Sequence, residues 1–333
     1  MDPTTPRTLL EAVSYFADAD RALKHFVKVR WPNGVACPRM GCGNANVQYI
    51  ATRKLWRCKE CKRQFTAKVG TIFEDSPISF SKWLPAVWLL ANTKNGTSAH
   101  ELGRALGVTQ KTAWFMLHRI RVAMRIGNFD KQLAGEVEVD ETYVCGKPRR
   151  KNVGRSNMHR KGGGHRDKAV VMGLIERGGR VRAFMLPDAK SVSLLSKIAE
   201  HVAPGTTLYT DALQSYRYVN REHYTHRVIN HAVKYVEGRV HTNSIENFWS
   251  CFKRTLHGTY IAPQPFHLGA YVDEQVFRFN ERKGNDADRF LATLKGADGR
   301  RLTYATLTAS HPLWRLKPGR AARALRSLSE HAR

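Results

Sequence analysis

Three acidic residues far apart in the chain, Asp140, Asp211 and Glu246, are of the type that divalent-metal chemistry requires. In-line cleavage of a phosphodiester uses two metal ions about 3.5–4 Å apart. Hard cations such as Mg²⁺ take oxygen ligands from a few carboxylates and from the substrate phosphate, so acids from distant segments must converge. Lys253 follows Glu246 by seven residues, about two turns on the same helical face. We therefore expect the acids to bind Mg²⁺ or Mn²⁺ and Lys253 to hold a phosphate.

The segments around these acids support the assignment and leave alternatives. The segment around Asp140 alternates, so its valines share one face, and Glu136, Glu138 and Asp140 point to the other. The second acid ends an apolar strand, where α/β sheets place functional residues. The third lies one turn into a predicted helix. The alternatives are Glu138 and Glu141 for the first position and Asn243 and Asn247 for the third.

Four of the six cysteines cluster within 25 residues, as Cys37, Cys42, Cys58 and Cys61. Four residues separate the first pair, two separate the second, and 15 lie between the pairs. Two such pairs on tight turns are a common tetrahedral ligand set for structural zinc; four unrelated buried cysteines are the alternative. Because four thiolates leave no open position, we expect the zinc to be structural and not catalytic.

Residues 98–125 have the pattern of two helices joined by a short turn. Ser98 and Glu101 can form a capping box at the first helix. Gly107 can end that helix, and Thr109 can cap the second. This unit is typical of helix-turn-helix proteins, in which the N-terminus of the second helix meets base edges or phosphates; an ordinary helical hairpin is the alternative. The DNA-contacting candidates are Gln110, Lys111 and Thr112.

The charge of the chain favours a polyanionic partner. Lys and Arg number 55 against 28 Asp and Glu, which leaves a net charge of +27. Each phosphate that a basic side chain neutralises releases counterions, so double-stranded DNA is the expected partner; a merely basic or ribosomal-type protein is the alternative. A membrane surface is disfavoured, since the sequence has no basic amphipathic anchor and no apolar run long enough to span a bilayer. With no signal-peptide core at the N-terminus, we expect a cytoplasmic protein associated with the nucleoid.

The apolar pattern predicts the elements that must position these groups. A helix is expected over 8–30, followed by a turn and short strands through the cysteines. From residue 135 the predicted order is strand, strand, strand, helix, strand, helix, strand, helix, a mixed α/β layout with a hairpin first and crossovers later. The predicted strands are 135–144, 169–176, 180–187, 206–211 and 225–230, and the helices cover 192–202 and 243–256, with another just after 211.

These elements divide the chain into four predicted parts. They are an N-terminal helix with a zinc ribbon at 8–75, a helix-turn-helix at 79–128, a catalytic domain at 133–290 and a basic tail at 291–333. The segment 146–168 carries nine Lys or Arg against one acid. We expect this segment to grip DNA between the first two strands of the catalytic domain.

Taken together, the motifs resemble the DDE transposases of bacterial insertion sequences, and within them the ISXO2-like group that has an N-terminal zinc ribbon. The resemblance covers residues 15–282. It rests on the four cysteines and on Trp31-Pro-Asn-Gly before Cys37-Pro38, Gly70-Thr-Ile-Phe73, Val139-Asp-Glu-Thr-Tyr143, Tyr209-Thr-Asp211, and His241-Thr-Asn-Ser-Ile-Glu-Asn-Phe-Trp249 followed by Phe252-Lys-Arg254.

The resemblance implies a ribonuclease H-like fold, Mg²⁺-dependent strand cleavage at the terminal inverted repeats of an insertion sequence, and strand transfer into a target DNA. By position it gives Asp140, Asp211 and Glu246 the D, D and E roles, with Asn243 as an alternative third residue. The 34 residues between Asp211 and Glu246 fit the spacing usual in such enzymes. We also expect a homo-oligomer assembled on DNA.

Two other classes of function are compatible with parts of the sequence. A catalytically inactive DNA-binding regulator would use the zinc ribbon and the helix-turn-helix but would not need three converging carboxylates. A ribonuclease H-like nuclease would cut DNA without joining it. The intact acids favour a transposase over a regulator, and strand-transfer products would separate a transposase from a nuclease.

Overall fold

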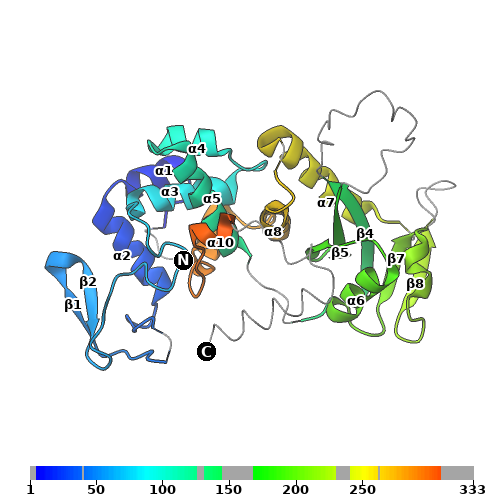
Figure 1. Ribbon diagram of the computed structural model, residues 1–333, viewed down its shortest axis with the longest axis horizontal. Helices are drawn as coiled ribbons and strands as arrows, with labels where there is room; N and C mark the ends of the chain where they lie inside the picture. The colour runs from blue at the N-terminus through cyan, green and yellow to red at the C-terminus, as the bar shows by residue number, and fades with distance from the viewer. Residues whose placement is uncertain are drawn as a thin grey trace, which may run out of the picture. The chain divides into compact units, whose positions relative to one another are not determined.

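The computed structural model describes residues 5–39, 41–125, 131–144, 168–229, 241–261 and 263–308, which form two compact units (Figure 1). Within those ranges, the first unit contains residues 5–125 and 281–308, and the second contains residues 131–280. Cys145 lies outside the described residues, and so does the basic segment predicted to grip DNA, except for its last residue. The tail beyond residue 308 also lies outside them.

The first unit begins with two helices where one was predicted. Helix α1 spans Leu9–Phe16 and helix α2 spans Ala19–Arg30. The chain breaks here because the Asp18 carboxylate accepts hydrogen bonds from the backbone N–H groups of Asp20 and Arg21 and so starts a new helix. The prediction of one continuous helix over 8–30 is therefore wrong.

The cysteine region is a small antiparallel sheet. Strands β1 (Val47–Ile50), β2 (Leu55–Cys58) and β3 (Gln64–Phe65) pair in that order. The ring of Trp56 on β2 packs against the rings of Trp31, Tyr49 and Phe65. This aromatic layer is the main apolar support of a sheet that is too small to have a core of its own.

Helices α3 (Phe80–Asn92), α4 (Ala99–Leu106) and α5 (Gln110–Met124) follow the sheet. The predicted capping box is formed in both directions between Ser98 and Glu101. Gly107 ends α4 with a left-handed φ of 59°. The Thr109 side chain accepts a hydrogen bond from the backbone N–H of Thr112 at the start of α5. The helix ends predicted from these capping residues are confirmed.

Two C-terminal helices, α9 (Asp286–Lys295) and α10 (Tyr304–Thr308), complete the first unit. Helix α9 packs on α3, and the ring of Phe290 contacts the rings of Trp88 and Phe16. The boundary between the second unit and the C-terminal part of the first unit lies after residue 280. The sequence had suggested a catalytic domain that ends at residue 290 and is followed by a tail. The difference arises because the apolar face of α9 finds its partner in a helix that is distant in sequence.

The second unit is built on a mixed five-stranded sheet of order β6-β5-β4-β7-β8. Its strands are β4 (Glu136–Val144), β5 (Ala169–Glu176), β6 (Val181–Leu186), β7 (Thr207–Asp211) and β8 (Thr225–Ile229). β4, β5 and β6 are antiparallel neighbours, whereas β7 lies parallel to β4 and β8 lies parallel to β7. The predicted hairpin followed by parallel crossovers is confirmed.

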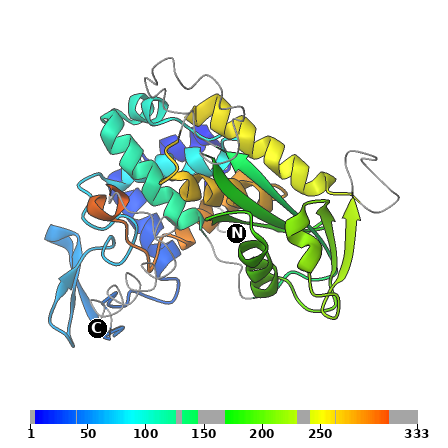
Figure 2. The same cartoon turned by 45° about the vertical axis from the view of Figure 1, so that its right-hand side comes forward.

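Helices cover both faces of this sheet, and Figure 2 shows α7 running along it. One face is covered by α7 (Asn243–Thr255), the π-helical turn η5 (Leu256–Tyr260) and α8 (Leu268–Asn280), and the other by α6 (Ser191–His201) and the 3₁₀ helix η4 (Gln214–Tyr218). Val137 and Val139 pack toward α6 and η4, as their alternation predicts. The helix expected just after 211 is the short η4. No helix among the described residues is both long and apolar enough to cross a bilayer.

Candidate active site and zinc centre

The four clustered cysteines have the dimensions of a zinc site. Their Sγ atoms all lie within 4.8 Å of one another. The Sγ atoms of Cys37 and Cys61 are 3.8 Å apart, and those of Cys42 and Cys58 are 3.7 Å apart. A tetrahedral site with Zn–S bonds of about 2.3 Å has S···S edges of about 3.8 Å. The sulfur positions therefore fit zinc, and the predicted clustering of the four residues is confirmed.

The backbone conformation tightens the first of these turns, and backbone hydrogen bonds favour the thiolate of Cys58 in the second. Gly41 and Gly43 adopt left-handed φ values of 78° and 58°, which tighten the first turn. At the second turn, burial acts to raise the pKa of Cys58, but hydrogen bonds from the backbone N–H groups of Cys61 and Glu60 outweigh it and lower that pKa to about 7. The thiolate, which is the form that binds zinc, is therefore favoured at Cys58.

Two of the three predicted acids hold equivalent positions on neighbouring parallel strands, Asp140 in the middle of β4 and Asp211 at the end of β7. β4 and β7 pair with Glu138 opposite Tyr209, so Asp140 and Asp211 hold equivalent positions two residues further along. The two carboxylates are close enough to interact, because Asp211 raises the pKa of Asp140. Asp211 Oδ1 also accepts a hydrogen bond from the backbone N–H of Leu213 at 3.0 Å, which orients this carboxylate.

Burial and like charge oppose full ionisation of the acids Asp140 and Glu141 on β4. Burial raises the pKa of Asp140 to about 7, with further contributions from Glu141 and Asp211. Burial also raises the pKa of Glu141 to about 7; the Tyr216 hydroxyl, 2.8 Å from Glu141 Oε2, opposes the shift, and Asp211 adds to it. A divalent cation would relieve this repulsion, and the carboxylate oxygens are the donors that Mg²⁺ and Mn²⁺ prefer.

The two glutamates proposed as alternatives to Asp140 lie on opposite faces of β4. Glu138 shares its face with Asp140 and is fully buried under α7, where it binds Arg177 and the first turn of the helix. Glu141 faces η4 and is electrostatically coupled to Asp211. The alternation predicted for β4 holds, and the face that carries Asp140 is covered by a helix. Glu138 is thus engaged by neighbouring protein groups, while Glu141 remains beside the acid pair.

Helix α7 carries the other predicted residues on its exposed side. Asn243, Glu246 and Lys253 are exposed, whereas the apolar residues between them are buried against the sheet. Glu246 Oε1 accepts a hydrogen bond from the Thr242 hydroxyl at 2.9 Å, within the first turn of the helix. The amphipathic pattern of α7 therefore places these polar side chains away from the core that fixes the helix.

Helix α7 approaches the sheet closely beside Asp140. The indole Nε1 of Trp249 donates a hydrogen bond to Asp140 Oδ2 at 3.0 Å. On the neighbouring strand, Gly173 pairs with Asp140, and a Cβ placed on Gly173 would lie 2.7 Å from side-chain atoms of both Ile245 and Trp249. A glycine at this position allows the helix to lie against the sheet next to the acid.

The structure therefore brings two predicted acids together and places the third on the helix that covers their face. The oxygens of Asp140, Asp211 and Glu246 do not form a closed ligand set. Across the described ranges, the four cysteines are the only group of three or more His, Cys, Asp or Glu side chains whose ligand atoms are placed to hold a metal ion together.

Comparison with known proteins recognises the same segments. The family model of the ISXO2-like transposase domain matches residues 132–280, and that of the transposase zinc-ribbon domain matches residues 17–64. An uncharacterized protein in the transposable element ISH50 of Halobacterium salinarum is 29% identical over 255 residues, which are 73% of this chain and 85% of that protein. An uncharacterized transposase-like protein of Haemophilus influenzae is 34% identical over 101 residues, which are 30% of this chain and 81% of that protein.

The chain belongs to the ISXO2-like transposase family. The family suggested by the sequence motifs is thereby confirmed. The transposase-domain match runs from just before β4 to the end of α8 and so includes Asp140, Asp211 and Glu246. The zinc-ribbon match includes all four clustered cysteines.

Sequence reasoning missed the aromatic residues that contact the acids of this ISXO2-like transposase. The Tyr216 hydroxyl donates to Glu141 from η4, and the Trp249 indole donates to Asp140 from α7. In an apolar pattern such residues are interpreted as core, because their periodicity says nothing about the polar N–H or O–H. The only available signal was that Trp249 ends the motif around Glu246.

The residues predicted to contact DNA lie at the start of α5 in the first unit. Gln110 and Lys111 are exposed, and Thr112 is half-buried with its hydroxyl 2.9 Å from that of Thr109. The Lys111 ammonium lies 5.1 Å from the centre of the Tyr304 ring on α10. Two of the three side chains are therefore directly available to a ligand, while the Thr112 hydroxyl takes part in capping the helix.

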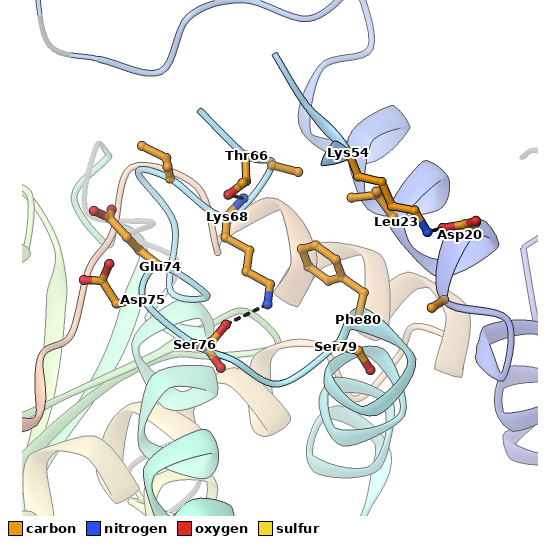
Figure 3. Close-up of a pocket in the computed structure, with 13 residues that line it drawn as sticks. Asp20, Leu23, Lys54, Thr66, Lys68, Glu74, Asp75, Ser76, Ser79 and Phe80 are labelled. Carbon is orange, nitrogen blue, oxygen red and sulfur yellow. Dashed lines mark hydrogen bonds and ion pairs between the residues drawn. The ribbon is translucent and has the colours of Figure 1, made fainter. Parts of the chain in front are cut away.

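A cavity of about 480 Å³ lies in the first unit between α2 and the segment 66–80 (Figure 3). Lys68 extends along its wall, and its ammonium donates hydrogen bonds to the carbonyl oxygens of Ser76 and Ile78 at 2.7 and 2.6 Å. The residues predicted to bind metal or DNA are not among those that line it. We assign this cavity no role in the chemistry of the acids.

Proposed function

We propose that this chain is a DDE-type transposase that binds the terminal inverted repeats of an insertion sequence and catalyses metal-dependent DNA cleavage and strand transfer. The observation that carries the proposal is the pair Asp140 and Asp211, which hold equivalent positions on adjacent parallel strands and repel each other by like charge, on a sheet covered by the helix that bears Glu246. Relatives named as a transposable-element protein and a transposase-like protein agree with it.

A ribonuclease H-like fold for the second unit is part of the proposal. Its support is the mixed sheet of order β6-β5-β4-β7-β8, in which an antiparallel hairpin precedes parallel crossovers and helices cover both faces. Asp211 then lies at the carboxyl end of its strand, where α/β sheets build their sites.

The metal site would use the chain's hard oxygen donors. Asp140 and Asp211 would hold Mg²⁺ or Mn²⁺, with Glu246 or Asn243 as the third ligand. The bound ions would supply the charge that activates the nucleophile and stabilises the leaving oxygen. The chain itself partly buries the acid pair, orients both carboxylates through hydrogen bonds, and carries Lys253 on α7, where it would hold a DNA phosphate.

Double-stranded DNA would be bound mainly through the first unit. Helix α4 lies close against the turn that precedes α5, since a Cβ on Gly103 would meet the Val108 carbonyl oxygen at 3.0 Å. Gln110 and Lys111 are exposed at the start of α5. The zinc ribbon would hold further basic side chains in place for the DNA backbone. We expect the protein to act on the element ends in the nucleoid as a homo-oligomer.

A cleavage assay tests this proposal. Zinc-loaded protein would be incubated with DNA that carries the element's ends, with Mg²⁺ or Mn²⁺. We expect Asp140→Ala and Asp211→Ala to reduce cleavage to background while a gel shift shows unchanged DNA binding, because the acids act on the metal and not on recognition. Glu222→Ala, which removes an exposed acid from the same unit, is the matched control and should cleave like the wild type.

The products separate the candidate activities. Cleaved ends joined to a second DNA would support the transposase. Cleavage without joining would indicate a nuclease, and DNA binding without metal-dependent cleavage by the wild type would indicate a regulator. Equal cleavage by the Asp140→Ala variant and the wild type would overturn the assignment of the acids.

A further inference from the structure

The first turn of α7 is held by a carboxylate from a different element. The four N-terminal N–H groups of a helix have no partner within it and need one from outside. The hydroxyl of Thr242, the residue before α7, donates to Glu246 and does not cap the helix backbone. Instead, Glu138 on β4 accepts the backbone N–H groups of Ser244 and Ile245 on Oε2, at 2.9 and 3.0 Å. The negative charge also suits the positive end of the helix dipole.

The rest of the Glu138 carboxylate is bound by basic groups. Arg177 Nε lies 2.9 Å from Glu138 Oε1, and His241 Nδ1 lies 3.4 Å from the same oxygen. Arg177 Nη2 donates to the His241 carbonyl oxygen at 2.8 Å, and the guanidinium lies 3.9 Å from the centre of the Tyr209 ring. A fully buried carboxylate is thus satisfied from three segments: the turn after β5, the residue before Thr242, and α7 itself.

Removing such a carboxylate leaves several buried partners unsatisfied at once. The two N–H groups of α7 would lose their acceptor, and Arg177 would lose its counter-charge in a site where its side chain is only 14% exposed. Unpaired buried groups of this kind are strongly unfavourable. The first turn of α7 would then shift or loosen to reach other partners.

The position of this turn matters for the acids. Asn243 and Glu246, two of the candidates for the third ligand, belong to the turn that Glu138 binds. One turn later, Trp249 contacts Asp140. α7 is therefore attached to β4 twice, once through Glu138 and once through Asp140. Because Asp140 is itself an expected metal ligand, Glu138 is the attachment that is independent of the metal.

We infer that Glu138, together with Arg177, is a positioning residue that fixes the first turn of α7 on the sheet and thereby sets the metal affinity of the acid site. The inference rests on the proposed function for the metal site, and it assigns Glu138 no contact with metal or DNA. Groups that orient metal ligands in this way typically affect affinity by about 10–100-fold.

The experiment compares Glu138→Gln with Glu136→Gln in the full-length, zinc-loaded protein. Glu136 is a matched control because it lies on the same strand and face and its Oε1 is 3.8 Å from Arg177, but it accepts the Tyr209 hydroxyl. Hydrogen exchange followed by mass spectrometry would measure the peptide covering 243–249 without added metal. Mn²⁺ binding would be measured by electron paramagnetic resonance at pH 8, where Asp140 and Glu141, with pKa values of about 7, are mostly ionised.

We expect Glu138→Gln to accelerate exchange in this peptide and to raise the Mn²⁺ dissociation constant roughly tenfold or more. Glu136→Gln should change the dissociation constant by less than about threefold, since it leaves the bonds to α7 intact. Glu138→Asp keeps the charge but is one methylene shorter, so it should fold and show an intermediate loss of Mn²⁺ affinity; it decides the question if the Gln variant unfolds.

The outcomes separate this inference from the proposed function. Unchanged exchange in Glu138→Gln would overturn the anchoring of α7. Faster exchange with unchanged Mn²⁺ affinity would overturn the link between the anchor and the metal site. If the zinc-loaded wild-type protein bound no Mn²⁺, this result would instead overturn the metal site of the proposed function.

Discussion

At the scale of single residues, Asp140 and Glu141 point to opposite faces of β4 but both have a pKa of about 7. Burial is the main cause for each, and the charge of Asp211 adds to it. A carboxyl whose pKa is higher in the folded than in the unfolded state binds its proton more tightly when folded. Its contribution to stability is therefore present at low pH and is lost as the pH rises through the folded pKa. The metal-free protein should lose stability between about pH 5 and pH 8 for this reason.

Asp140→Asn removes one of these charges. We expect it to stabilise the metal-free protein at pH 8 by on the order of 2–4 kcal/mol, because a neutral amide has no charge to desolvate and no repulsion from Asp211. Added Mg²⁺ or Mn²⁺ should raise the melting temperature of the wild type at pH 8 and leave that of the variant nearly unchanged. Thermal unfolding at pH 6 and pH 8 provides the measurement.

The exposed residue Glu222 supplies the control for this comparison. Glu222→Gln removes a carboxylate from the same unit without removing a buried charge, so its pH profile should follow the wild type. A melting temperature of Asp140→Asn at pH 8 that is equal to or below that of the wild type would contradict the electrostatic account of the acid pair.

At the scale of elements, the zinc ribbon and α7 are both held in place by groups outside their own local hydrogen bonding. The three short strands of the ribbon have an aromatic layer around Trp56, and their turns converge on four sulfurs. Helix α7 has an amphipathic face but also needs a carboxylate from β4 for its first turn and a glycine on β5 for its close approach. In both cases local sequence forms the element, and a distant group fixes its place.

Cys58→Ser should remove zinc and unfold residues 35–70, because three sulfurs hold zinc far more weakly than four and the small sheet depends on the metal. Zinc content by mass spectrometry and limited proteolysis of the region would measure both effects. Cys251→Ser is the matched control, since Cys251 lies on α7 and outside the cluster. Full zinc content and unchanged proteolysis in Cys58→Ser would contradict the structural role of the metal.

At the scale of the whole molecule, the net charge of +27 should dominate the affinity of the protein for DNA. Neutralising each phosphate releases counterions, so binding should weaken steeply with salt, by about 10³-fold or more between 50 and 200 mM if at least about six phosphates are contacted. The charge would attract DNA of any sequence. We expect recognition of particular ends to use the side chains at the start of α5.

Lys111→Ala tests the DNA surface of the first unit. We expect weaker binding to the element ends and a plot of log K against log salt whose slope is smaller by about 1, as for the loss of one phosphate contact. Lys197→Ala is the control, because Lys197 is paired with Glu200 at 2.6 Å in the second unit. An unchanged slope for Lys111→Ala, measured by fluorescence anisotropy over a salt series, would place the DNA surface elsewhere.

Much of the fold could be predicted from the sequence because the relevant signals are local. The ends of α4 and α5 follow from Ser98, Gly107 and Thr109, whose capping bonds span only a few residues. The alternation along β4 predicted its two faces, since strand geometry fixes which side chains share a side. Asp18 was missed because a capping aspartate inside an amphipathic pattern looks like one more exposed polar residue.

For the candidate site, local patterns identified residue types and strand ends but not their partners. The sequence by itself determined the cysteine ligand set, the hairpin followed by crossovers, and the pair Asp140 and Asp211 as candidates, because spacing and periodicity are properties of short segments. Only the tertiary structure decided that Glu138 binds a helix 106 positions later. It alone also decided that α9 belongs to the first unit. Such contacts depend on which buried groups meet after packing, and no local periodicity encodes the identity of a distant partner.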